Sequence, residues 1–159
     1  EGAEALYRRA LAGREKALGA EHPDTLKSAY ELGLTLLRRR KCAEAEPLLL
    51  CEFTATKASD GEFSDPAKGS ALTYAMCLKR LGRLDEATNL LRSYLDSNRG
   101  YFRYNLACYE CLCGNVEQSK RLIAEEVAAK PAAREEALKD DDLKAIWDFI
   151  RNLAENKAK

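Results

Sequence analysis

The feature that most constrains this sequence is a pattern that recurs at a fixed spacing. The segments GAEALYRRAL, CAEAEPLLLCE and RLDEATNLLRSYL share it, and their residues Ala3, Ala45 and Ala87 are spaced by 42 residues. A fourth copy, NVEQSKRLIAEEV, has Ser119 at the alanine position, 32 residues after Ala87. A small residue at one place on a helix allows close approach of a neighbouring helix. Self-similarity at a period of about 20–50 residues is the signature of a repeat architecture.

A second helical pattern precedes each of the last three copies. The segments LKSAYELGLTLLRRR, GSALTYAMCLKRLG and YFRYNLACYECLCG each contain a large residue followed by a small one. These pairs are Leu32-Gly33, Tyr74-Ala75 and Leu106-Ala107. Gly82 and Gly114 follow as predicted helix stops. Two helices joined by a tight turn, and repeated, predict an all-α solenoid of helical hairpins.

The whole pattern resembles the tetratricopeptide repeat. Five residues of the segment from Tyr104 to Pro131 fall in register with that motif: Leu106, Ala107, Gly114, Ile123 and Pro131. The segment YRRALAGREKALGAEHPDTL is similar to the longer repeats of kinesin light chains, which share the 42-residue spacing and the HPD loop. Three departures are Ser119 in place of Ala, Glu110 in place of the usual Tyr, and Ser64 to Pro66 (SDP) in place of HPD.

The resemblance implies a right-handed superhelix of antiparallel hairpins with a C-terminal capping helix. We expect a single domain over 1–159, built from a half repeat (1–19), three repeats (24–60, 66–98 and 100–131) and capping helices (132–159). The half repeat lacks a first helix, so we expect the chain to be part of a longer protein. Asp24, Asp65 and Asn115 are the predicted N-caps of three helices, and Asp140 to Asp142 offer caps at a break near the C-terminus.

Composition excludes several classes of protein. Lys+Arg and Asp+Glu both number 26, so the formal net charge is zero, unlike that of a general nucleic-acid binder. No apolar run approaches the roughly 18–20 residues that span a bilayer. The six cysteines lie within helical patterns rather than in loops. We therefore expect a reducing intracellular compartment, with the cytoplasm favoured and an organelle interior left open because a targeting segment can be missing.

Catalysis and cofactor binding are not expected. The single histidine, His22, is not tied to a nucleophile motif, and no GxGxxG, GxxxxGK[ST] or HExxH occurs. Cys108, Cys111 and Cys113 form C-x-x-C-x-C, but zinc needs four ligands and no second ligand pair has a suitable spacing. Small buried or groove-lining residues are the favoured interpretation of these cysteines, with a thiol redox or metal site as a low-ranked alternative.

The resemblance places the working surface on the first helices of the repeats, which line a concave groove. Carried over to this chain, the groove residues are Tyr30, Leu34, Leu37, Arg38, Leu72, Met76, Lys79, Arg80, Tyr101, Tyr104, Asn105 and Cys108. Tyr30 and Leu34 stand where some family members have the Lys and Asn of a carboxylate clamp, which disfavours recognition of chaperone tails. Aromatic residues and Met are enriched in binding surfaces, and a basic rim favours a partner with acidic flanks.

These patterns predict a non-catalytic scaffold that binds a peptide or helix of another protein, within a larger multiprotein assembly. We expect Tyr30, Leu34, Met76 and Tyr104 to form the contact core. The alternative is a permanently bound structural subunit or assembly factor that uses its open N-terminal face or its convex face.

Overall fold

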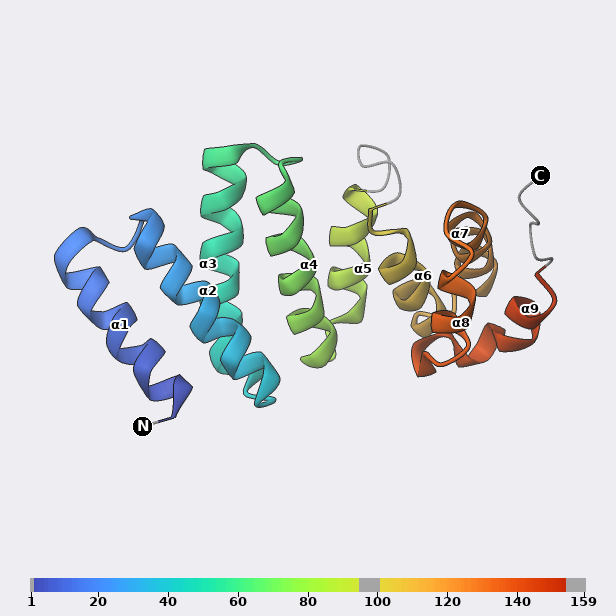
Figure 1. Ribbon diagram of the computed structural model, residues 1–159, viewed down its shortest axis with the longest axis horizontal. Helices are drawn as coiled ribbons and strands as arrows, with labels where there is room; N and C mark the ends of the chain where they lie inside the picture. Colours follow the sequence, from blue (N-terminus) through green and yellow to red (C-terminus); the bar gives the residue numbers. More distant parts are fainter. Residues whose placement is uncertain (1, 95–100, 154–159) are drawn as a thin grey trace. The chain divides into compact units, whose positions relative to one another are not determined.

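The computed structural model describes residues 2–94 and 101–153 (Figure 1). Within these ranges the chain is all-α, with nine α-helices, one 3-10 helix and no strand. It divides into two compact units, Glu1–Arg83 and Leu84–Lys159, which are described separately. Residues 95–100 and 154–159 include parts of the predicted repeats 66–98 and 100–131 and of the cap 132–159, and lie outside the described residues. Organisation as a single domain stays a prediction.

The first unit consists of four helices in an antiparallel arrangement. They are α1 (Ala3–Leu18), α2 (Pro23–Arg38), α3 (Cys42–Asp60) and α4 (Asp65–Arg80). Each helix packs on the next one along the chain (Figure 1). The predicted hairpin pattern is therefore present in this unit.

Gly33 explains how closely α2 and α3 pack. A Cβ atom at Gly33 would lie 2.7 Å from Leu49 Cδ2 and 2.9 Å from Leu49 Cγ, closer than carbon atoms approach in proteins. Leu49 is only 1% exposed, and Ala45, one turn before it in α3, is fully buried. The large–small pair and the repeated alanine identified in the sequence are thus the residues at which the two helices meet.

Short turns that need a left-handed residue follow α2, α4 and α6 (Arg103–Leu112). Gly82 has φ +79° after α4, and Gly114 has φ +81° after α6. Glycine adopts this conformation without a steric penalty, and the prediction that both glycines stop helices is confirmed. Arg40 takes the same place after α2, with φ +61°, as the one non-glycine residue of the described chain at positive φ.

A buried carboxylate near the start of α1 gathers part of the basic run at 38–41. Glu4, which is 8% exposed, accepts hydrogen bonds from Lys41 Nζ (2.9 Å), Arg8 Nη2 (3.0 Å) and Arg39 Nη1 (2.8 Å). These cations hold the pKa of Glu4 at about 2, below its ordinary value of 4.5. Two of the four basic residues therefore tie α1 to the turn between α2 and α3.

This cluster predicts a loss of stability in acid. In the folded chain Glu4 stays ionised down to about pH 2, whereas in the unfolded chain it binds a proton near pH 4.5. The ion pairs therefore stabilise the fold fully above about pH 5, and that contribution disappears as the pH falls from 4.5 towards 2. We expect the melting temperature, followed by circular dichroism, to fall further over this range in the wild type than in Glu4→Gln. An equal fall in both proteins would contradict the assignment.

Two of the predicted helix caps are wrong, each by a small shift along the chain. His22, not Asp24, is the N-cap of α2, and its Nδ1 accepts the Asp24 N–H at 3.2 Å. Ser64, not Asp65, caps α4 by accepting the Ala67 N–H at 3.2 Å. Pro23 directly follows the cap His22, and Pro66 is the second residue after the cap Ser64, so each proline lies in the first turn of its helix.

Asn115 is the N-cap residue of α7 (Val116–Ala129), as predicted, but its side chain makes no capping hydrogen bond. Its Nδ2 donates instead to Glu110 Oε2 at 2.8 Å. Asp140, by contrast, caps the 3-10 helix η1 (Asp141–Ile146) by accepting the Asp142 N–H at 3.0 Å, as expected.

The second unit contains the remaining elements. They are α5 (Leu84–Ser93), α6 (Arg103–Leu112), α7 (Val116–Ala129), α8 (Ala133–Ala137), η1 (Asp141–Ile146) and α9 (Trp147–Arg151). α6 packs against α5, α7 and η1, and α7 packs against α8 and α9. The sequence departure at Ser119 has a clear role here, since its Oγ donates to the buried carbonyl of Ala107 at 2.7 Å.

The segment after α7 covers one end of this unit, as a capping element of a solenoid does. Leu143, Ile146 and Ile150 are buried to within 1% of full burial. Trp147 Nε1 donates to the carbonyls of Ala137 (3.1 Å) and Asp140 (3.2 Å), which fixes the bend between α8 and η1. The cap therefore consists of short helical pieces rather than one continuous helix.

Candidate functional site

The predicted groove residues of the first unit lie on α2 and α4. Two hydrogen bonds join these helices: Tyr30 Oη lies 3.2 Å from Thr73 Oγ1, and Arg80 Nη1 donates to the Leu37 carbonyl at 2.6 Å. Because these bonds lie about two helical turns apart, they hold the two helices beside each other. Among the predicted residues, Leu34 and Leu72 are half-buried and Met76 is 37% exposed.

We call this region the α2–α4 surface, comprising Tyr30, Leu34, Leu72 and Met76 with Arg38 and Arg80 at its basic end. Both arginines are exposed. Lys79, next to Arg80 in the sequence, is half-buried and interacts with another group of the chain. Leu37 is only 3% exposed, so it supports the surface from below and offers little contact area itself. The residues brought together form an apolar patch that ends in positive charge.

The predicted groove residues of the second unit have different surroundings. Tyr101 is 54% exposed and packs edge-on against Phe102, and Asn105 is half-buried. Tyr104 Oη donates to Asp140 Oδ2 at 3.1 Å, and Cys108 Sγ lies 3.6 Å from the same oxygen. The C-terminal segment therefore covers Tyr104 and Cys108 with the chain's own residues.

Asp140 was expected only to cap a helix, and its contact with α6 was missed. Burial raises the pKa of Tyr104 above its ordinary value, and the negative charges that Cys108 and Asp140 carry when ionised raise it further. Tyr104 thus remains a hydrogen-bond donor to Asp140 across the neutral pH range. Asp140 lies 36 residues after Tyr104. The run Asp140 to Asp142 shows three identical residues, so the sequence does not indicate which of them both caps a helix and accepts a hydrogen bond from Tyr104.

The cysteines of the C-x-x-C-x-C motif face different neighbours. Cys108 lies against Asp140, Cys111 is buried, and Cys113 Sγ lies 3.4 Å from Thr88 Oγ1. Burial raises the pKa of Cys111, which disfavours the thiolate needed for metal binding or redox attack. In the part of the chain that the structure describes, the three potential metal ligands within 4.8 Å of one another are Cys108, Asp140 and Asp142, not the three cysteines.

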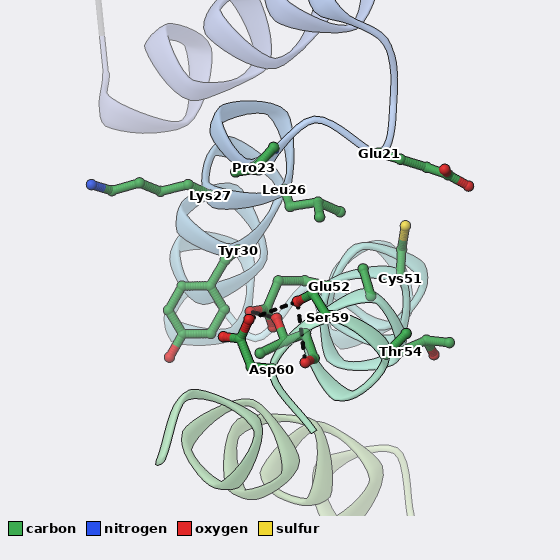
Figure 2. Close-up of a pocket in the computed structure, with 13 residues that line it drawn as sticks. Glu21, Pro23, Leu26, Lys27, Tyr30, Cys51, Glu52, Thr54, Ser59 and Asp60 are labelled. Carbon is green, nitrogen blue, oxygen red and sulfur yellow. Dashed lines mark hydrogen bonds between the residues drawn. The ribbon is translucent and has the colours of Figure 1, made fainter. Parts of the chain in front are cut away.

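A pocket of about 970 Å³ opens between the first half of α2 and the second half of α3 (Figure 2). We call it the α2–α3 pocket. It is lined by Glu21, Pro23, Leu26, Lys27, Tyr30, Cys51, Glu52, Thr54, Ala55, Thr56, Ala58, Ser59 and Asp60. Tyr30, from the predicted contact core, lies among them, so sequence reasoning identified one wall of this site but not the pocket itself.

A sequence signal for this pocket does exist. Glu52 interrupts the apolar run LLLCEFTA, and Thr56 and Ser59 follow it at helical spacing on the same face of α3. A carboxylate with hydroxyl groups at these positions indicates a polar strip on an otherwise apolar helix. A polar strip of this kind is also what the solvent-exposed face of a helix has, so the sequence alone does not indicate a pocket. The strip lines one here because α2 lies beside it.

Comparison with known proteins gives one result. Residues 1–55 match the family model described as Tetratricopeptide repeat, a span that contains α1, α2 and most of α3. A search of curated proteins found no match. The finer similarity to kinesin light chains stays a prediction. No helix among the described residues is long and apolar enough to cross a membrane.

Proposed function

We propose that this chain, which is a tetratricopeptide repeat protein, is a non-catalytic scaffold that binds a peptide or helix of a partner protein within a larger assembly. Repeats of this family generally mediate protein–protein interaction. The observation that carries the proposal is the α2–α4 surface. Its apolar side chains stay partly exposed while hydrogen bonds near both ends hold the two helices in place.

Preorganisation is the mechanism by which this surface gains affinity. Because α2 and α4 are already joined through Tyr30–Thr73 and Leu37–Arg80, binding does not carry the entropic cost of ordering these two helices. Leu34 and Met76 offer apolar area, and Met adapts its shape to irregular partners. Arg38 and Arg80 favour a partner with acidic residues at the end that lies near them.

In the second unit, Tyr101 and Asn105 are the proposed contacts on α6, because their side chains remain accessible. Tyr104 and Cys108 act on the partner only indirectly, by fixing the C-terminal segment through Asp140. The contact core is therefore proposed to lie mainly on Tyr30, Leu34 and Met76.

A second candidate function is supported by α1. Leu6 and Leu18 on this helix are 44% and 47% exposed, which leaves apolar side chains uncovered at one end of the first unit. A structural subunit held permanently through this face would co-purify with its partner in a one-to-one ratio and aggregate when isolated. The α2–α4 surface would then have no part in binding.

The two candidates are separated by a matched pair of variants. We expect a Leu34→Glu/Met76→Glu variant to lose its partner in affinity purification from the source organism's extract, read by mass spectrometry, because two charges enter an apolar contact. Leu50→Glu is the control and should keep the partner, because Leu50 lies on α3 and is 41% exposed, close to the 37% of Met76. Circular dichroism checks that all variants remain helical.

Retention of a stoichiometric partner by both variants would refute binding at the α2–α4 surface and would favour the structural subunit. Leu6→Glu would then be the variant that loses the partner.

A further inference from the structure

The α2–α3 pocket contains a carboxylate, that of Glu52, of which one oxygen accepts hydrogen bonds from the described residues and the other does not. Glu52 Oε1 accepts hydrogen bonds from Ser70 Oγ at 2.8 Å and Thr56 Oγ1 at 2.9 Å. Glu52 Oε2 is buried and has no hydrogen-bond partner among the described residues. A buried acceptor without a donor loses its hydration without replacement, and the cost is larger when the acceptor is charged. Because this oxygen is buried, an external donor reaches it only after the Glu52 side chain turns toward the pocket, and that contact would recover the cost.

The charges around the pocket favour a cation. Three carboxylates line it, from Glu21, Glu52 and Asp60, against one ammonium group, from Lys27. In Figure 2 the Lys27 side chain extends outward, away from Glu52. Asp60 Oδ1 accepts the Ser59 hydroxyl at 2.9 Å, which holds this second carboxylate at the wall. Burial also raises the pKa of Glu52, as expected for a carboxylate that lacks a nearby cation.

The remaining walls are apolar and include one aromatic ring. Leu26 and Tyr30 line the pocket (Figure 2), together with Ala55 and Ala58. A long basic side chain suits such a lining, because its methylene stem can cover apolar surface while its charged head meets a carboxylate. An arginine head also stacks on aromatic rings and is more weakly hydrated than the ammonium of lysine.

We infer that the α2–α3 pocket binds one arginine side chain of the partner protein, with its guanidinium donating to Glu52 Oε2 and its stem lying against Leu26 and Tyr30. The inference rests on the proposed function and specifies the chemistry of the partner. Arginine suits the site better than lysine because its fork of five donors can serve Glu52 and a second acceptor at once. Tyr30 thereby belongs to both the pocket and the α2–α4 surface.

The test uses a single arginine side chain as the probe. N-acetyl-arginine-N-methylamide is titrated into the ¹⁵N-labelled chain and followed by amide chemical shifts. We expect saturable shifts confined to the first half of α2 and the second half of α3. The citrulline analogue has the same shape without the charge, and should produce no saturable shift. The lysine analogue should bind more weakly than the arginine compound.

Glu52→Gln should raise the dissociation constant of the arginine compound about tenfold or more, because it removes the charged acceptor. Glu135→Gln removes the same charge from an exposed position on α8 and should leave it unchanged. Equal binding of the citrulline analogue, or no saturable binding of the arginine compound, would overturn the inference. If Glu52→Gln does not fold, the comparison of arginine with citrulline on the wild type decides it.

Failure here and failure of the proposed function give different results. A partner that depends on Leu34 and Met76, combined with no arginine binding in the pocket, would leave the scaffold function standing and remove only the arginine site. Arginine binding in the pocket, combined with a partner that is retained by the Leu34→Glu/Met76→Glu variant, would leave the arginine site standing and refute binding at the α2–α4 surface.

Discussion

Replacing Gly33 with valine is expected to lower the free energy of unfolding by about 1–3 kcal/mol, the range for overpacking a closely packed site. The first added carbon alone would lie 2.7 Å from Leu49 Cδ2. Leu49 is 1% exposed and Ala45, one turn before it in α3, is fully buried, so the Leu49 side chain has little room to move. The clash can therefore be relieved only by separating α2 from α3. Urea denaturation followed by circular dichroism measures the effect.

Gly69 provides the matched control for this substitution. It lies inside α4, and a Cβ atom at this position would meet nothing within 4 Å. Valine has a better helix propensity than glycine by a few tenths of a kcal/mol, so Gly69→Val should be neutral or slightly stabilising. If Gly33→Val proves as stable as Gly69→Val, close packing of α2 on α3 is not what requires glycine at position 33.

Removing Arg92 is expected to cost about 3 kcal/mol, because it leaves a buried charge without its cation. The side chain of Glu110 is 1% exposed, and its Oε1 accepts hydrogen bonds from Arg92 Nη2 at 2.7 Å and Nε at 3.1 Å. In Arg92→Met the amide of Asn115 would be the one side-chain donor left to the carboxylate within residues 2–94 and 101–153. The free energy of unfolding of the second unit, measured in urea, should fall accordingly.

The expected effect is asymmetric. Glu110→Gln should cost less than Arg92→Met, because the guanidinium of Arg92 is half-exposed and can return to water. Combining the two substitutions should restore part of the loss caused by Arg92→Met. Arg121→Met, at an exposed position of α7, is the control and should change stability by no more than about 0.5 kcal/mol. Equal losses at Arg92 and Arg121 would show that Glu110 does not depend on its partner.

Much of the fold followed from the repeat because its marker residues have one physical role each. Gly82 and Gly114 are needed where the backbone turns left-handed, and Gly33 is needed where two helices touch. The caps were less predictable. His22 and Ser64 are the N-caps, where Asp24 and Asp65 were expected. Several residues of each loop carry a hydrogen-bond acceptor, and the backbone conformation of the loop determines which of them reaches the first N–H groups of the helix.

The candidate site was harder to predict for a related reason. Exposure of Met76 and the position of Tyr30 on α2 follow from helical periodicity. Asp140 reaches Tyr104 because the short helices after α7 fold back against α6. No periodic pattern in the sequence predicts the path of these short helices. The same holds for the pocket, because Tyr30 and Glu52 become neighbours only through the hairpin between them.

The distribution of cysteines gives the native sequence a selective attachment point for a fluorescent reporter. Cys51 lines the α2–α3 pocket and is exposed, whereas Cys42, Cys77, Cys108 and Cys111 are buried and Cys113 is half-buried. Burial raises the pKa of Cys77 to about 11, which keeps its thiol protonated and slow to react. A maleimide dye applied briefly at neutral pH should therefore label Cys51 first, so that occupancy of the pocket can be followed by emission without engineering a single residue.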